Sequence, residues 1–329
     1  MKRSRFVGLS VLVVAALIAP VASVAQTVGG IHRVGVIYLG GHHQVIVDGL
    51  RQGLRDLGLE EGSKHVVFDL KEIKSGDWAA VGPAARDLER AHVELIYTVT
   101  TQVTIAAKKA TTQVPIVFYV GVDPVAAGLV ESFAKPGGRL SGVHSLSRDL
   151  TVKRMEILKE MVPKIHRVVT FYDDRETISK QNANLAHKVA QQMGVQLVQR
   201  NVDSVEEMRA ALQGLTSGGI QAYFHTPGGT ATSQSLLTID AARAKKLPTM
   251  FHDTSLVARG ALAAYGHNYL EIGRLSAKHV QRILAGVQPR DLPVENYDKV
   301  GLALNLRTAR EIGLTIPPSV RFRADQVIE

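Results

Sequence analysis

Short apolar runs alternate with longer amphipathic segments along almost the whole chain. Residues 33–39 (RVGVIYL) and 93–99 (VELIYTV) are apolar nearly throughout rather than at every second position. Such runs are typical of strands that are buried on both faces of a parallel sheet. Residues 44–57 carry apolar residues at helical spacing and are followed by Gly58, a residue type that commonly ends a helix. The pattern therefore predicts strands and helices in alternation.

The same alternation of strands and helices continues along the chain and predicts the fold class. Expected strands cover residues 33–39, 65–71, 93–99, 115–120, 139–145, 167–173, 195–202, 220–226, 247–251, 261–266 and 299–305. Expected helices cover residues 44–57, 77–91, 102–111, 151–162, 178–193, 204–214, 231–246 and 269–285. The alternation runs through twice, which predicts an α/β protein of two Rossmann-like, doubly wound parallel-sheet lobes joined by hinge strands.

The last strand-like segment, 299–305, follows the second round of alternation, so the chain is expected to cross back to the first lobe. We assign residues 26–146 and about 296–329 to lobe 1, and residues 147–295 to lobe 2. Hinge strands are expected near residues 145–148, 266–268 and 290–299.

The first 25 residues have the three parts of a secretory signal peptide. A basic start, residues 1–5, precedes an apolar run over 6–19 that is too short to span a bilayer. Small residues in Ser23-Val24-Ala25 then precede Gln26, where we expect cleavage. An uncleaved anchor is the alternative. The leader predicts a periplasmic protein with no membrane insertion after cleavage.

Composition narrows the function further. The formal charge of +9 falls to +6 once the three basic residues of the leader are removed, which is too modest for a nucleic-acid interface. The aromatic content of 5% also argues against a platform for single-stranded nucleic acid. Because the chain has no Cys, it has no disulfide, thiolate nucleophile, zinc–thiolate site or lipidated cysteine.

In open parallel sheets, ligands bind outside the carboxyl ends of the strands. The loops after the expected strands are rich in hydroxyl, amide and charged groups, which suits a small polar ligand. The candidate ligand-binding residues are His42, Thr100, Thr101, Gln102, Tyr119, Asp123, Asp173, Asp174, Arg175, His225, Thr226 and Asp253.

Thr100 and Thr101 stand beside the expected start of a helix, where backbone N–H groups and the helix macrodipole favour a carboxylate. Plain N-capping is the alternative. Arg175 either pairs with a ligand carboxylate or lies in solvent at the rim. Tyr119 either walls an apolar part of the ligand or packs in the core.

The lobe 2 loops carry three carboxylates, Asp173, Asp174 and Asp253, against Arg175. If these carboxylates point into the cleft, they repel an anion and favour an amino group, and Asp123 of lobe 1 would do the same. The charge pattern thus predicts a zwitterionic or amine-bearing ligand such as an amino acid. The alternative is that the carboxylates cap nearby helices and leave no net charge in the cleft.

Six of the 12 histidines fall near expected strand ends or a hinge. They are His42, His43, His144, His225, His252 and His267. Such a set could line a ligand cleft or hold a transition metal, or its placement could be a coincidence. The spacing matches no metal signature, so we expect no metal site.

Enzyme motifs are scarce. The chain has no phosphate-binding GxxxxGK[ST] loop, no GxGxxG after the first strand, no GxSxG and no HExxH. We therefore expect a protein with no catalytic residues and no cofactor.

Three stretches resemble the solute-binding proteins of ABC importers, in the TrpX-like subfamily with the type I periplasmic-binding fold. They are GLRQGLRDLGLEEG (49–62), PIVFYVGVDPVAAGLVESFAKPGGRLSGV (115–143), and GALAAYGHNYLEIGRLSAKHVQRILAGVQPRDLPVE (260–295) continued by 302–329. The resemblance covers nearly all of 33–329. It implies a small-molecule ligand clamped between the lobes by hinge closure, with Thr100, Thr101 and Asp123 at matching positions.

The same resemblance implies an ABC permease of the inner membrane as the partner, and a diffusing carrier of this kind is expected to be a monomer. In lobe 2, residues 173–176 stand where the family usually has small polar residues, and residues 225–229 stand where it usually has an Asp-containing loop. These two departures leave the identity of the ligand open. A ligand-sensing module of a receptor system and, more remotely, a secreted enzyme are the alternatives.

Overall fold

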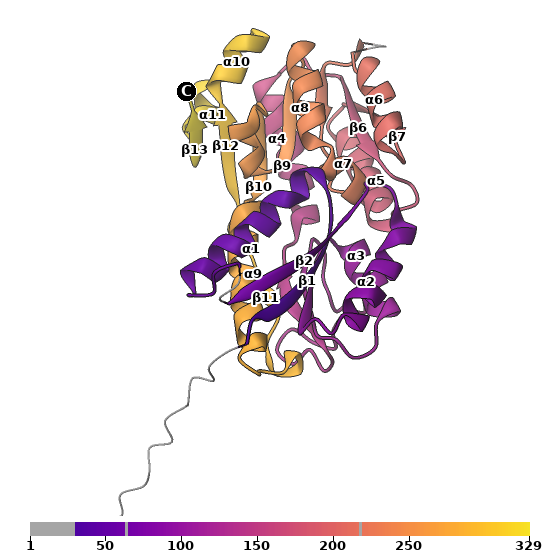
Figure 1. The fold of residues 1–329 in the computed structure, drawn as a ribbon. Coiled ribbons are helices and arrows are strands. Elements are labelled where there is room, and N and C mark those ends of the chain that lie inside the picture. The colour runs from indigo at the N-terminus through magenta and orange to yellow at the C-terminus, as the bar shows by residue number, and fades with distance from the viewer. Residues whose placement is uncertain (1–29, 63–64, 217–218) are drawn as a thin grey trace, which may run out of the picture. The chain divides into compact units, whose positions relative to one another are not determined.

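Two β-sheets covered by helices build the chain from Ile31 to Glu329, which forms one unit (Figure 1). The structure is a computed structural model and describes residues 30–62, 65–216 and 219–329. The expected signal peptide, residues 1–25, lies outside the described residues. Within these ranges, no helix has the length and apolar character needed to span a membrane.

The first sheet has the strand order β11-β5-β4-β3-β1-β2, and all its pairs are parallel. Its strands are β1 (His32–Leu39), β2 (Val66–Ile73), β3 (Leu95–Val99), β4 (Ile116–Val120), β5 (Leu140–His144) and β11 (Glu295–Asn296). Its helices are α1 (Gln44–Asp56), α2 (Val81–Arg90), α3 (Thr101–Ala110) and α9 (Tyr269–Leu284).

The second sheet has the order β13-β12-β10-β9-β8-β6-β7 and is parallel except for the pair β10–β12. Its strands are β6 (Arg167–Tyr172), β7 (Gln196–Asn201), β8 (Ala222–Phe224), β9 (Thr249–Asp253), β10 (Ala263–His267), β12 (Gly301–Asn305) and β13 (Gln326–Ile328). Its helices are α4 (Thr151–Met161), α5 (Thr177–Gln192), α6 (Val205–Gln213), α7 (Gly229–Ser233), α8 (Ser235–Ala244), α10 (Leu306–Ile312) and α11 (Pro318–Arg321).

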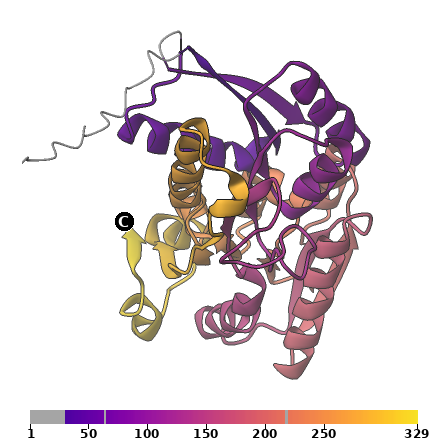
Figure 2. The same cartoon turned by 90° about the horizontal axis from the view of Figure 1, so that it is seen from below.

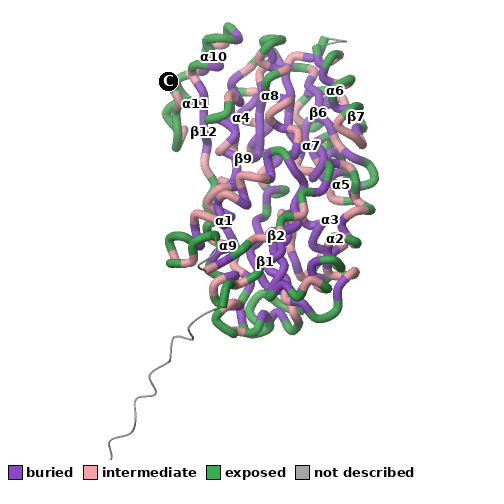
Figure 3. The backbone as a smooth tube through the Cα atoms, in the orientation of Figure 1, coloured by how far each residue is buried: buried purple, intermediate pink, exposed green. Residues whose placement is uncertain are grey.

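The apolar strands are buried on both faces, as their sequence predicts. Along β1, Val34 and Val36 belong to one hydrophobic cluster, and Ile37 and Leu39 belong to another on the opposite face. The inner strands β3, β4 and β5 are buried at every residue, and Figure 3 shows the exposed residues mainly on the outside of the molecule. This arrangement confirms the two doubly wound α/β lobes.

Helices α1 and α9 pack with their backbones in contact because each supplies a glycine at the crossing (Figures 1 and 2). A Cβ atom on Gly49 would lie 2.1 Å from the carbonyl oxygen of Leu270, and one on Gly273 would lie 2.0 Å from that of Ile46. Any side chain at either glycine would force the helices apart.

The chain crosses between the sheets three times, after β5, after β10 and after β11, close to the expected hinges. Lobe 1 therefore consists of residues 31–144 with 269–296, and lobe 2 of 151–267 with 301–329. The expected placement of 269–295 in lobe 2 and of 296–329 in lobe 1 is wrong. The glycine crossing holds α9 on lobe 1, and β12 then returns to pair with β10.

Candidate functional site

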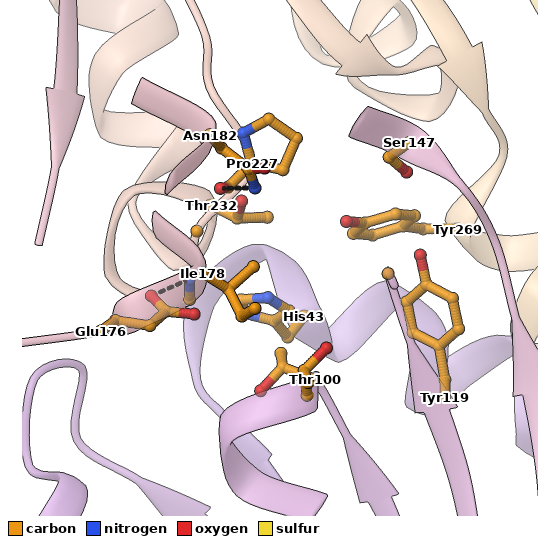
Figure 4. A pocket seen from close by; sticks show the side chains of 14 residues that line it. His43, Thr100, Tyr119, Ser147, Glu176, Ile178, Asn182, Pro227, Thr232 and Tyr269 are labelled. Atoms are coloured by element: carbon orange, nitrogen blue, oxygen red, sulfur yellow. Dashed lines mark hydrogen bonds between the residues drawn. The ribbon is translucent and has the colours of Figure 1, made fainter. Parts of the chain in front are cut away.

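A cavity lies between the two lobes, where the carboxyl ends of strands from both sheets meet (Figure 4). The empty space within it, open solvent included, is about 440 Å³, and about 50 Å³ of this is accessible to the centres of water molecules. Its lining residues are His43, Thr100, Thr101, Tyr119, Gly121, Ser147, Glu176, Ile178, Asn182, Pro227, Gly228, Gly229, Thr232 and Tyr269.

Thr100 joins β3 directly to α3 and has a backbone φ of 85°, an uncommon conformation for a β-branched residue. Its backbone is fixed on both sides: its N–H donates to Tyr119, and its carbonyl accepts from the Thr104 hydroxyl at 2.7 Å. The Thr100 hydroxyl is buried, caps no N–H group and has no hydrogen-bond partner among the described residues. Simple N-capping therefore does not explain this residue. Strained backbone of this kind is typical of binding sites.

Two further cavity-lining side chains also have an unpartnered buried atom: His43 Nδ1 and Asn182 Oδ1. Burial lowers the pKa of His43 to about 3, so its imidazole is neutral. The Asn182 amide donates to the carbonyl of Pro227 at 2.8 Å, which leaves its oxygen free. Buried polar atoms without partners are rare because each costs free energy. With the Thr100 hydroxyl, they provide three hydrogen-bonding positions for a polar ligand.

Glu176 is the carboxyl group of the cavity wall and is only 3% exposed. It stands at the start of α5, and its Oε2 accepts a hydrogen bond from the backbone N–H of Gly229 at 2.7 Å (Figure 4). The pKa of Glu176 is raised to about 8: burial raises it most, the Gly229 hydrogen bond opposes this, and the nearby carboxylate of Asp173 adds to the rise.

The opposite wall carries the hydroxyl groups of Tyr119, Tyr269 and Ser147 (Figure 4). The Tyr119 and Tyr269 rings meet edge to face at 5.6 Å. Tyr269 is the first residue of α9, and the side chain of Asn268 fixes it there by capping that helix.

Behind Ser147 lies the fully buried guanidinium of Arg154. Its Nη2 donates to the Ser147 carbonyl at 3.2 Å and to the Thr151 hydroxyl at 3.0 Å, whereas Nε and Nη1 have no partner. Burial lowers its pKa to about 10, so it remains a cation at neutral pH. This charge favours an anionic group in the space beside it.

Three of the twelve predicted residues, Thr100, Thr101 and Tyr119, line the cavity. Gln102 lies on α3, half-buried, and is not part of the wall. The His225 ring is instead hydrogen-bonded to the Tyr223 hydroxyl at 2.9 Å and to the Thr232 hydroxyl at 3.1 Å. The Thr226 hydroxyl is hydrogen-bonded to the Thr170 hydroxyl at 2.9 Å.

The expectation that Asp123, Asp173, Asp174 and Asp253 face the cleft is wrong, because each is either bound to other groups of the protein or exposed to solvent. Asp123 accepts from the N–H groups of Val125 and Ala126 in its own turn. Asp173 is buried and binds Arg175, Thr230 and Trp78, and Asp174 is exposed. The guanidinium of Arg175 is taken up by Asp173 and by the carbonyl of Asp203.

Asp253 bonds His42 of the other lobe at 2.5 Å and also accepts from the N–H groups of Ser255 and Tyr269. Neither His42 nor Asp253 lines the cavity. Both are buried in the contact between lobes, and their bond links residues 211 positions apart.

Two of the six strand-end histidines pack against each other. His225 and His252 stack with ring centroids 4.7 Å apart, and His252 also bonds the Tyr269 hydroxyl at 2.7 Å. The described part of the chain contains no set of three His, Cys, Asp or Glu side chains placed to hold a metal ion.

The candidate ligand-binding residues did not include Glu176, His43, Asn182 or Tyr269, although His43 was among the strand-end histidines that could line a cleft. Glu176 is one residue beyond a predicted site loop, and His43 is next to the predicted His42, so position along the chain pointed close to both. No pattern in the sequence marks Asn182, on the second turn of α5, or Tyr269, after the hinge.

The lobes touch directly around the cavity. The Trp78 indole donates to Asp173 at 3.3 Å, and the Ser233 hydroxyl donates to that of Ser75 at 2.8 Å. Gly41 packs so closely on lobe 2 that a Cβ there would lie 1.9 Å from the carbonyl oxygen of Ser233. The two lobes are therefore in direct contact beside the cavity.

Comparison with known proteins agrees with the two-lobed α/β fold. A family model described as ABC transporter substrate binding protein matches residues 33–328. A tyrosine-binding protein of Clostridioides difficile is 27% identical over 267 residues, which cover 81% of this chain and 76% of the relative.

Among solved structures, a Streptococcus pneumonia ABC domain in complex with L-Trp aligns with a TM-score of 0.76 and 25% identity, over 90% of this chain and 100% of that one. The ligand-free, open form of a Clostridium difficile substrate-binding protein aligns with a TM-score of 0.57 and 24% identity, over 91% and 99% of the two chains.

Proposed function

Because the chain belongs to the family of ABC transporter substrate-binding proteins, we propose that it captures an amino acid or a related zwitterion outside the cytoplasm for an ABC importer. It delivers this solute to a permease of the inner membrane and releases it unchanged. The observation that carries the proposal is the cavity between the lobes, whose wall holds three buried polar atoms that have no partner in the described part of the chain.

The ligand's carboxylate binds at Thr100. The Thr100 hydroxyl is free, and α3 begins at the next residue, where unpaired N–H groups and the helix macrodipole favour an anion. The cation of Arg154, behind the opposite wall, adds to this preference. A carboxylate in the cavity would therefore satisfy groups that the protein alone leaves unpaired.

Hinge closure couples binding to delivery. Higher similarity to the L-Trp complex than to the open, ligand-free structure supports a closed conformation for this chain. Three crossings join the lobes, and opening about them would break the contacts of His42 with Asp253 and of Trp78 with Asp173. A ligand that touches both lobes shifts such an equilibrium towards the closed form.

A thermal-shift screen of the purified mature protein tests the proposal. The panel contains the twenty L-amino acids, with ribose, arabinose and succinate as neutral and dianionic comparisons. A ligand at a hundredfold excess over its Kd stabilises the folded protein by about 2.7 kcal/mol, which raises Tm by several degrees.

We expect at least one amino acid to stabilise the protein and the sugars to have no effect. Stabilisation by sugars or succinate alone would contradict the zwitterion. The importer role is tested separately: deletion of the gene should abolish uptake of the radiolabelled ligand in the producing bacterium, and undiminished uptake would refute it.

A further inference from the structure

Glu176 is a buried carboxyl group for which the residues that the structure describes supply no positive partner. Its side chain lines the cavity, and its Oε2 receives the N–H of Gly229. Among the described residues, no Lys, Arg or His forms an ion pair with it. An ionised carboxylate in such a place is costly unless a cation or several donors accompany it.

The charged groups around Glu176 do not supply the cation that its carboxylate would need. Asp173 precedes it on the loop after β6 and is itself held by Arg175, whose guanidinium faces Asp173 and Asp203. His43 reaches the same cavity from lobe 1 but is neutral at physiological pH. The other elements that line the cavity beside Glu176, the start of α3 and the loop before α7, contribute Thr and Gly groups without charge.

We infer that Glu176 binds the ligand's ammonium group and gives up its own carboxyl proton as that group arrives, so that one proton leaves to solvent for each amine bound. This inference rests on the proposed function, because it requires an amine-bearing ligand. The charge of the site stays constant: a neutral carboxylic acid and a solvated ammonium become a carboxylate–ammonium pair and a released proton.

The direction of the pH dependence follows from this exchange. Below about pH 8 the free site holds the proton, which burial keeps on Glu176. The complex has lost that proton, so affinity rises as pH increases, by up to about tenfold per pH unit, and levels off near pH 8. A ligand without an amino group would show no such rise.

The free protein provides the first test. If Glu176 is protonated when folded and ionised when unfolded, the folded state holds one extra proton between about pH 4.5 and pH 8, so stability falls as pH rises through this window. Urea unfolding at several pH values should show this fall. Glu176→Gln, which keeps the Gly229 hydrogen bond, should flatten it. Glu60→Gln, an exposed carboxyl on lobe 1, is the matched control and should retain it.

Calorimetric titration provides the second test. L-Tryptophan and L-tyrosine are titrated at pH 7 in phosphate and in Tris, whose ionisation enthalpies differ, and any other amino acid that passes the thermal-shift screen is treated likewise. We expect about one proton released per ligand in wild type and none in Glu176→Gln, which should bind at least tenfold more weakly. The deamino analogues, indole-3-propionate and 3-(4-hydroxyphenyl)propionate, should release none.

The outcomes separate the two proposals. If an amino acid binds without releasing a proton, or if Glu176→Gln binds it as tightly as wild type, the proton exchange is wrong and the amino-acid function stands. If no amino acid binds, the proposed function fails and this inference fails with it. A wild-type stability profile identical to that of Glu176→Gln would overturn the protonated Glu176 without any ligand.

Discussion

Replacing Gly41 with alanine should weaken ligand binding by blocking closure of the lobes. Gly41 follows β1 with φ +67°, and a Cβ built on it would lie 1.9 Å from the backbone carbonyl oxygen of Ser233 in lobe 2. Real Cβ contacts essentially never fall below 3.0 Å, so the two backbones would have to separate by at least 1.1 Å, the difference of those distances. Because the obstacle is backbone, no side-chain rotation can relieve it.

The magnitude follows from the kind of contact. Forcing an extra methyl group into well-packed surroundings costs about 1–3 kcal/mol. Gly41 meets Ser233 only when the lobes are closed, so this cost falls on the closed, ligand-bound form. At 1.4 kcal/mol per tenfold, Kd should rise about five- to 150-fold. The lost closure should also weaken the neighbouring contact between Ser75 and Ser233.

Gly58→Ala is the matched control, because Gly58 has φ +81° and nothing lies within 4 Å of its added Cβ. Both variants pay the backbone cost of alanine at positive φ, about 1 kcal/mol of stability. The control alone should bind normally. Calorimetry measures Kd, and small-angle X-ray scattering measures the radius of gyration with and without the amino acid. If Gly41→Ala and Gly58→Ala bind equally well, the reasoning from closure is refuted.

Three further substitutions test other parts of the account. Thr100→Val keeps the β-branched shape and should weaken amino-acid binding by about 1.5–3 kcal/mol in calorimetry. Stability should change little, because the lost hydroxyl has no partner among the described residues of the free protein. Unchanged affinity would show that Thr100 is not part of the ligand site. Asp123→Asn should leave affinity within about twofold, since this carboxylate serves only the N–H of Val125 and its neighbour; a tenfold loss would restore it as a ligand-binding residue. Gly273→Ala should lower the free energy of unfolding in urea by about 1–3 kcal/mol, because its Cβ would meet the Ile46 carbonyl at 2.0 Å; equal stability would contradict the tight helix crossing.

The sequence predicts the two lobes well because the evidence for them is local. Inner strands such as β1 and β3 are apolar along most of their length, and this pattern alone indicates burial on both faces. The three crossing points also fall where expected. The lobe to which α9 belongs is not a local property. It depends on a contact between Gly49 and Gly273, which lie more than two hundred residues apart in the sequence. The sequence around a helical glycine does not indicate which residue it will contact.

The site is predicted only in part for the same reason. Thr100 and Tyr119 line the cavity between the lobes, in agreement with the general rule that ligands of open sheets bind at the strand ends. Whether a strand-end carboxylate faces that cleft depends on competing partners. Asp253 is held by His42 from the other lobe, whereas Glu176 has a single N–H partner and stays at the cavity wall. Only the folded chain distinguishes these two acids.

A crystal structure of the protein with the amino acid that stabilises it most would test the central claim directly. The account predicts the ligand between the lobes, with its carboxylate about 2.7–3.2 Å from the Thr100 hydroxyl and its ammonium within the same range of the Glu176 carboxylate. It also predicts that the contacts of His42 with Asp253 and of Trp78 with Asp173 are present. An amino acid bound outside this cavity, or bound to one lobe with the other apart, would contradict the account.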